Sequence, residues 1–202
     1  MAFLGLEATA DQPSPAGARA IQTIETTNGV NVEQLVDTIE AIREQPDIAD
    51  FRFRVTNRWV DGGQNETTIS GFFGACQEVE RKRSFELAAD EPPVLLGNDS
   101  GPNPVEYALT ALASCMTTAM VYHAAARGIR VESVESRLEG DLDLHGFLGL
   151  KDDVRKGYKD VRVSFKVKAD ATPEQLAELT KYSPVFDIFA NPVPVSVDVE
   201  ME

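Results

Sequence analysis

The residue with the clearest chemical potential in this 202-residue sequence is Cys115, which lies within a long apolar stretch. A thiolate attacks peroxides and disulfides, but a thiol becomes reactive at neutral pH only when a nearby cation or a helix N-terminus lowers its pKa. Cys115 lies about three turns from the expected start of its helix, where the helix dipole has little effect. A cysteine in an apolar helix can also fill space as a small hydrophobic residue. Activation of Cys115 would therefore require a residue from elsewhere in the chain.

The two histidines and the second cysteine do not form a recognisable site with Cys115. His123 lies eight residues further along the same helix, about 80° around its axis and ~12 Å along it, too far for a cysteine–histidine pair. His145 falls in a loop, and Cys76 is most simply a strand or loop residue. These residues do not have the spacing of a zinc site, and residues 97–104 lack a phosphate-binding glycine pattern. We therefore predict neither a metal nor a cofactor.

Four charged residues have both a structural and a functional interpretation. Glu106 stands three residues after Asn103, which is the spacing of a helix capping box. Three arginines fall on one face of an expected strand: Arg52, Arg54 and Arg58. These arginines form either a solvated strand edge or a group that reaches over a thiolate at a subunit boundary.

A long helix must position Cys115. Asn103 is a good N-cap, Pro104 suits the first turn, and Gly128 supplies a left-handed stop. The helix should run for about 24 residues, roughly 36 Å at ~1.5 Å per residue. Its apolar residues spread around every side, and such a helix must be enclosed on all faces. One small sheet cannot enclose it, so we expect a second copy of the chain to cover it in a homodimer.

The remaining hydrophobic patterns predict strands and shorter helices around this long helix. The expected elements are a helix from 31 to 46, strands over 51–55, 66–74 and 84–88, strands over 131–142 and 161–168, a helix from 172, and a final strand over 193–201. This order predicts an α+β fold: a β-meander, a long central helix, a second short helix and further antiparallel strands. We interpret residues 1–46 as an N-terminal extension with one helix, mobile or loosely docked up to about residue 29, and residues 47–202 as the main domain.

Composition restricts the partners of this chain. The net charge is -14, which argues against nucleic acid and anionic membranes, since both are bound through basic surfaces. Two cysteines without a disulfide-scaffold pattern indicate a reducing compartment. The N-terminal residues lack the pattern of a signal peptide, and residues 107–126 favour a buried helix over a membrane span. We therefore expect a cytoplasmic protein with no nucleic-acid or membrane partner.

Two motifs resemble those of the OsmC family, which is related to the organic hydroperoxide resistance proteins. The first comprises residues 101–106 (GPNPVE) followed by 111–115 (ALASC), and the second comprises 183–185 (SPV) with 191–195 (NPVPV). The resemblance covers the chain from about residue 50 to its end. It implies an OsmC-like fold in which two sheets wrap around the paired long helices of an intertwined homodimer.

The resemblance also implies a set of site residues. In active relatives a peroxidatic cysteine attacks the hydroperoxide, a second cysteine resolves the sulfenate as a disulfide, and an arginine and a glutamate organise the thiolate. Cys115 matches the first position, whereas the second falls on Ser183, which cannot form a disulfide. The glutamate position falls on Val105, one residue before Glu106, and Arg58 is the arginine nearest to the expected place. The candidate catalytic residues are therefore Cys115, Glu106 and Arg58.

Two functions remain open from the sequence. The first is a peroxiredoxin-like, oxidative-stress function: Cys115 reduces organic hydroperoxides as a single peroxidatic cysteine, and an external thiol reduces the sulfenic acid. Cys76 could resolve the sulfenic acid instead. The alternative is a non-enzymatic dimer that binds a small apolar molecule in the equivalent pocket, with Cys115 as a packing residue.

Overall fold

The computed structural model describes residues 26–201 of the chain, so the expected loose extension over residues 1–25 lies outside the described residues. In chain order the elements are β1 (Thr26–Thr27), β2 (Val30–Asn31), α1 (Val32–Glu44), η1 (Pro46–Ala49), β3 (Arg52–Phe53), β4 (Thr56–Asp61), β5 (Gln64–Ile69), β6 (Phe72–Gly74), β7 (Gln77–Val79), β8 (Phe85–Ala89), η2 (Pro93–Leu95), α2 (Pro104–Ala125), β9 (Val131–Asp141), α3 (Leu144–Phe147), β10 (Asp160–Ala169), α4 (Pro173–Thr180) and α5 (Pro184–Ala190). This mixture of helices and antiparallel strands confirms the predicted α+β class.

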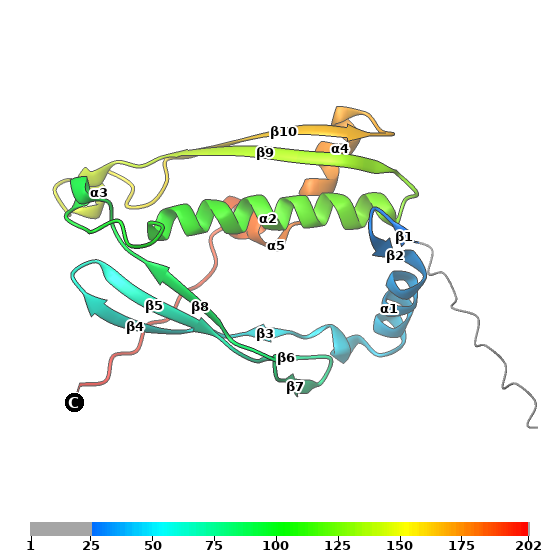
Figure 1. Ribbon diagram of the computed structural model, residues 1–202, viewed down its shortest axis with the longest axis horizontal. Helices are drawn as coiled ribbons and strands as arrows, with labels where there is room; N and C mark the ends of the chain where they lie inside the picture. The colour runs from blue at the N-terminus through cyan, green and yellow to red at the C-terminus, as the bar shows by residue number, and fades with distance from the viewer. Residues whose placement is uncertain (1–25, 202) are drawn as a thin grey trace, which may run out of the picture.

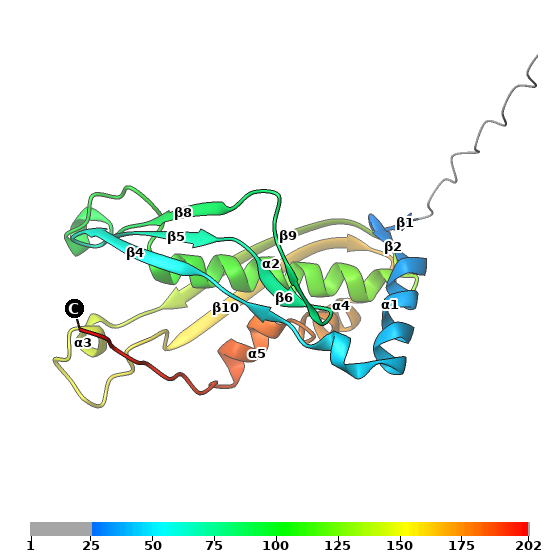
Figure 2. The same cartoon turned by 90° about the horizontal axis from the view of Figure 1, so that it is seen from below.

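The long helix α2 lies between two layers of strands (Figure 1). On one side, β9 and β10 form a long antiparallel pair whose register runs from Asp141 opposite Asp160 to Val131 opposite Ala169. On the other side lie two three-stranded antiparallel sheets with the orders β4-β5-β8 and β3-β6-β7. The short helices α4 and α5 pack against α2 and lie to one side of it when the molecule is turned (Figure 2).

Local sequence signals set both ends of α2 as predicted. The Asn103 side chain accepts a hydrogen bond from the backbone N–H of Val105 at 2.9 Å, and the Glu106 carboxylate accepts one from the backbone N–H of Asn103 at 2.9 Å. This reciprocal capping box satisfies two backbone donors that have no partner within the helix. Beyond the C-terminus, Gly128 has a φ of +69°, the left-handed conformation that ends helices.

The hydrophobic core lies around the C-terminal half of α2. Its buried members are Met120 and Ala124 of α2 with Leu176 and Leu179 of α4. Alternate residues of β10 face this core, so the predicted in–out alternation of residues 161–168 is confirmed. The packed side of α2 is therefore covered within one chain by β9, β10 and α4.

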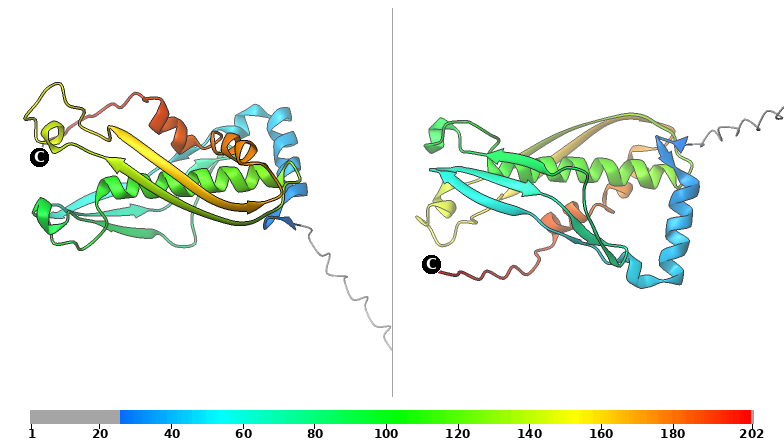
Figure 3. Two further views of the ribbon diagram at one scale, coloured as in Figure 1. Left: turned by 90° about the horizontal axis from the view of Figure 1, so that it is seen from above. Right: turned by 60° about the horizontal axis from the view of Figure 1, so that its bottom comes forward.

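Residues 26–50 connect the two layers at one end of the molecule. The Asn28 side chain donates to the carbonyl of Ile129 at 2.9 Å and accepts from the N–H of Val131 at 2.8 Å, which fastens the β1–β2 hairpin to the start of β9. From there α1 crosses to the layer that contains β3 (Figures 1 and 3). The Asn31 cap of α1 is confirmed, and the domain boundary after residue 46 stays a prediction.

The expected strand over 66–74 is interrupted at residues 70–71 and divided into β5 and β6, which belong to different sheets. Two further predicted strands differ in the single chain. Only Arg52–Phe53 of the expected strand over 51–55 forms a ladder, and Phe51, Phe53 and Val55 are exposed rather than half-buried. Residues 193–201 form no strand, and their apolar side chains are exposed. The physical reason is the same in both places, because an alternating pattern produces a half-buried strand only where a neighbouring strand and a covering layer are available.

We predict that Leu179→Ala lowers the free energy of unfolding by about 3 kcal/mol, because it leaves a cavity between α4 and α2. Leu179 is 5% exposed. The matched control is Val94→Ala, at a side chain that is 84% exposed, for which we expect a change below about 0.5 kcal/mol. Urea unfolding followed by circular dichroism measures both, and similar losses for the two variants would contradict this description of the core.

Candidate functional site

Cys115 lies on α2 at the border between its packed side and its open side. The thiol is free and partly exposed. Leu112, one turn earlier, and Met116, the next residue, are both buried. The helix therefore holds Cys115 between buried neighbours and the side of α2 that one chain leaves open.

Glu106 is exposed, and its carboxylate is engaged in the capping box of α2. The capping role that the sequence predicts for this residue is therefore confirmed. Its charge also acts on Tyr158, because burial first and the Glu106 carboxylate second raise the pKa of that phenol. No hydrogen bond within the described residues joins Glu106 to Cys115.

Arg58 lies on β4, in the layer opposite to β9 and β10 (Figure 1). Its guanidinium forms an exposed ion pair with Glu66 of β5 at 2.5 Å. The neighbouring Arg54 is paired in the same way with Glu78 at 2.7 Å. In the described part of one chain these arginines thus pair with carboxylates and not with the thiol of Cys115, so a single chain does not assemble the three candidate residues.

Ser183, at the position that the resemblance gives to a second cysteine, has a structural role. Its side chain is buried and its hydroxyl accepts a hydrogen bond from the backbone N–H of Phe186 at 3.0 Å. With Pro184 in the first turn, Ser183 caps α5, a helix that the sequence analysis missed. A Ser-Pro pair before apolar residues is the local signal that could have revealed this helix.

Cys76 lies in the turn between β6 and β7 and is exposed. It and Ala75 have φ values of +60° and +50°, a conformation that favours glycine. The hairpin belongs to the layer opposite to β9 and β10 (Figure 1). Cys76 and Cys115 are both free thiols in this structure.

The histidines take part in separate surface clusters. The His123 ring stacks on Tyr182 with centroids 4.0 Å apart and its Nδ1 accepts an N–H of Arg127 at 3.1 Å. Burial first, and the charge of Arg127 second, lower the pKa of His123. His145 Nδ1 lies 2.8 Å from Asp143. Across residues 26–201 no group of three or more potential ligands could hold a metal ion.

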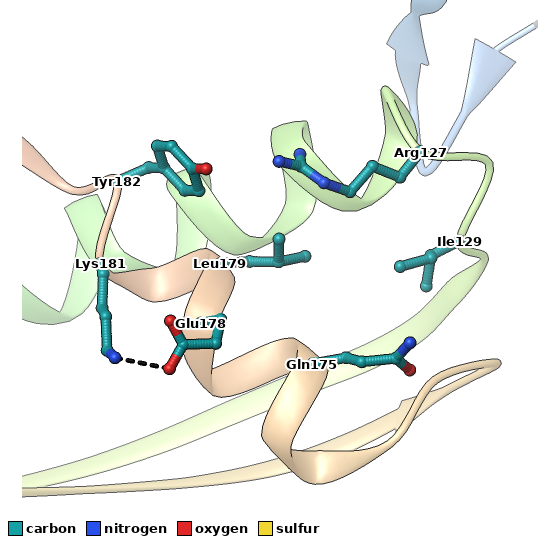
Figure 4. A pocket seen from close by; sticks show the side chains of 7 residues that line it. All are labelled: Arg127, Ile129, Gln175, Glu178, Leu179, Lys181 and Tyr182. Carbon is teal, nitrogen blue, oxygen red and sulfur yellow. Dashed lines mark hydrogen bonds and ion pairs between the residues drawn. The ribbon is translucent and has the colours of Figure 1, made fainter.

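A hollow of about 500 Å³ lies beside the cluster of Arg127 and Tyr182, at the C-terminal ends of α2 and α4 (Figure 4). Leu179 and Ile129 form its apolar floor, and the Arg127 guanidinium lies 5.5 Å from the Tyr182 ring centre at its rim. Lys181 is paired with Glu178 at 2.5 Å. The cations here complement the negative ends of two helix dipoles, and neither cysteine lies among the residues that line the hollow.

The residue that sequence reasoning missed is Asp90, which is fully buried at the end of β8. Its carboxylate accepts hydrogen bonds from the backbone N–H groups of Glu91, Asn98 and Ser100 and from the Ser100 hydroxyl, at 2.8 to 3.1 Å. The amide of Gln64 adds a longer one at 3.4 Å. These hydrogen bonds, led by the Ser100 N–H, hold the pKa of Asp90 well below its usual range although burial acts in the opposite direction.

Residues 101–107 hold the start of α2 against β8. The Tyr107 hydroxyl donates to the carbonyl of Ala88 at 2.7 Å. A Cβ on Gly101 would lie only 2.6 Å from that same carbonyl oxygen, so glycine is required there. The Asn103 amide also donates to the Glu91 carboxylate. The residues of the helix-start motif thus fix where α2 begins, which in turn fixes the position of Cys115.

Comparison with known proteins identifies the family. The profile of the OsmC-like proteins matches residues 97–198, about half of the chain, and includes the Asn103 cap, Cys115 and Ser183. The chain belongs to the OsmC-like protein family. No curated protein sequence matches it.

Solved structures agree with this family assignment at the level of the fold. An OsmC-like protein from Mycoplasma pneumoniae has a TM-score of 0.53 at 13% identity, covering 70% of this chain and 89% of that chain. An OsmC-like protein of unknown function from Vibrio cholerae has a TM-score of 0.50 at 16% identity, covering 70% and 92%. The fold of this chain is therefore OsmC-like, as the resemblance implied.

We predict that Asp90→Asn lowers the unfolding temperature at pH 7 by roughly 5 °C or more. An amide has one acceptor oxygen in place of two, which leaves buried N–H donors without partners. The matched control is Asp99→Asn, at an exposed residue of the same loop.

The pH dependence of this difference follows from the lowered pKa of Asp90. Above the unfolded value of about 3.9 the stabilisation is complete, and it is lost as the pH falls through the lower folded value. The difference in stability between wild type and Asp90→Asn should therefore shrink below about pH 4. A difference that stays constant down to pH 2 in thermal unfolding would show that the carboxylate charge is not what holds the loop.

Proposed function

We propose that this OsmC-like protein is a stress-response enzyme that reduces organic hydroperoxides through Cys115 as a single peroxidatic cysteine. The observation that carries the proposal is the free, partly exposed thiol of Cys115 on the central helix of an OsmC-like fold. Two features support it. The thiol occupies the position that the family resemblance gives to the peroxidatic cysteine, and the Asp90 loop holds the helix that carries it.

The proposed reaction needs an external thiol. The Cys115 thiolate attacks the terminal peroxide oxygen, the O–O bond breaks, and the departing alkoxide takes a proton to become an alcohol. The resulting sulfenic acid reacts with a small external thiol to release water, and a second thiol then frees Cys115 from the mixed disulfide. Ser183 cannot replace this reductant because a hydroxyl forms no disulfide.

A homodimer would complete the site. Nine hydrophobic residues are buried within residues 26–201, whereas many large ones are exposed, including Phe51, Phe53 and Trp59. Apolar surface of this extent on a soluble chain marks an interface. A second copy that covers these residues and the open side of α2 would bring its own β4 near Cys115, so we propose that Arg58 acts on the thiolate from the partner copy.

The net charge and the helices of the chain bear on its partners and its cellular location. A net charge of -14 disfavours binding to nucleic acid or anionic lipid, and no helix formed by residues 26–201 is long and apolar enough to cross a membrane. We propose a cytoplasmic location, where thiols that can reduce a sulfenic acid are abundant.

Non-enzymatic binding of a small apolar molecule is the second candidate. It is favoured by the structural use of the other site positions: Ser183 caps α5, Glu106 caps α2, and Arg58 pairs with Glu66. In this alternative Cys115 is a packing residue and its replacement leaves binding intact.

The enzymatic proposal predicts that reduced protein consumes cumene hydroperoxide with dihydrolipoamide as reductant. Cys115→Ser should lower the rate at least about 100-fold, to the level of the buffer, because no other nucleophile lies at the proposed position. Cys76→Ser is the matched control and should retain activity. Stopped-flow consumption in which wild type and Cys115→Ser are equal would leave only the binding alternative.

The homodimer proposal predicts that Val197→Asp weakens self-association at least about tenfold. Val197 is 79% exposed in the single chain and belongs to the apolar segment over residues 193–201, which we propose the second copy also covers. A charge placed in such an interface has no partner there. Ser196→Asp, on the opposite face of the alternating segment, is the matched control. Sedimentation equilibrium should find dimers for wild type and Ser196→Asp. A monomeric wild type, or an unchanged Val197→Asp dimer, would refute this interface.

A further inference from the structure

A groove of about 510 Å³ lies between α2, β10 and α5, and Cys115 is not among the residues that line it. These three elements lie side by side in both the view from below and the view from above (Figures 2 and 3). The groove is within the size range of small-molecule sites, about 300–1,000 Å³.

The walls of the groove are apolar. Leu112 of α2, which is 3% exposed, forms the base. Val161 and Val163 of β10 and Phe186 and Phe189 of α5 are half-buried along the two sides. Side chains of this kind take up a hydrocarbon chain and offer no hydrogen bonds to a polar one.

The mouth of the groove is positively charged. Arg155 lines it and forms no ion pair or side-chain hydrogen bond with any residue in the range 26–201. Lys159 has its nearest carboxylate, that of Asp143, at 3.8 Å. Asp160 also lines the mouth, but its carboxylate accepts a hydrogen bond from Arg162 at 2.8 Å. Two cations with free donors therefore face an opening of an otherwise strongly acidic chain.

The loop that carries these cations is held in place. The Tyr158 hydroxyl donates to the carbonyl of Val105 at 2.8 Å, which ties the loop to the first turn of α2. A Cβ on Gly140 would lie 2.5 Å from the Tyr158 ring, and one on Gly146 would lie 2.5 Å from the Arg155 carbonyl oxygen. These close contacts fix the backbone on both sides of the mouth. The tyrosine proton is already donated, so Arg155 and Lys159 are the donors left for a ligand.

We propose that this groove binds an apolar carboxylate, a medium-chain fatty acid anion, with its chain between β10 and α5 and its carboxylate on Arg155 and Lys159. A guanidinium matches a carboxylate with two parallel hydrogen bonds. The nearby Asp160 disfavours a doubly charged phosphate head. The site does not contain Cys115, so the inference goes beyond the proposed peroxide reaction and does not depend on it.

Calorimetric titration of the full chain with sodium decanoate tests the proposal. We expect one binding site per chain and at least about tenfold weaker binding of 1-decanol, which has the same chain without the charge. Arg155→Gln should weaken decanoate binding about tenfold and leave decanol binding unchanged. Lys166→Gln, on the solvent face of β10, is the matched control and should bind decanoate as wild type does.

A second variant tests the apolar wall. Ile188 lines the groove and is 51% exposed, so Ile188→Glu should leave the circular dichroism spectrum unchanged and abolish decanoate binding. Equal affinity for decanoate and decanol, or full affinity in Arg155→Gln or Ile188→Glu, would overturn the proposal. Cys115→Ser should bind decanoate normally, so a failure of this site and a failure of the peroxide reaction are distinguishable.

Discussion

The structure depends on the buried carboxylate of Asp90. A buried ionised carboxylate is tolerated only when hydrogen bonds replace its water, and the backbone of the loop over residues 91–102 supplies most of them. That requirement fixes the path of the loop, which ends where Tyr107 and Gly101 meet the carbonyl of Ala88. The start of α2 is therefore held against β8. The loop therefore fixes the start of the helix that carries Leu112 and Cys115, and packing against α4 and β9 holds the rest of it.

Helix α2 serves two different surfaces. Its packed side, toward β9, β10 and α4, is complete within one chain and contains the core. Its other side remains open, and the layer that faces it carries exposed aromatic residues such as Phe53 and Trp59. The open side of α2 also bears on the candidate residue Arg58. Arg58 pairs with Glu66 on the layer that faces the open side, and in the homodimer that we propose the partner's copy of this layer would face Cys115.

The two proposed sites use the polar residues of the chain in opposite ways. Of the residues that the resemblance relates to the thiol, Glu106 and Ser183 are already engaged, because each caps a helix. At the groove beside Leu112, by contrast, Arg155 has no carboxylate partner among residues 26–201 and lies next to apolar walls. A cation at the mouth of an apolar groove favours binding of an anion, whereas in our proposal the thiol is completed by a second copy.

The sequence by itself determined the elements whose signals are local. The caps of α2, the stop at Gly128 and the alternation of residues 161–168 depend on neighbours within a few positions, and the family motif around Cys115 gave the fold. Tertiary structure alone decided the rest. The role of Asp90 depends on donors eight and ten residues away that only a folded loop brings together. Residues 51–55 and 193–201 have strand patterns, but a strand is stabilised by a partner strand and a covering layer, and one chain does not provide them.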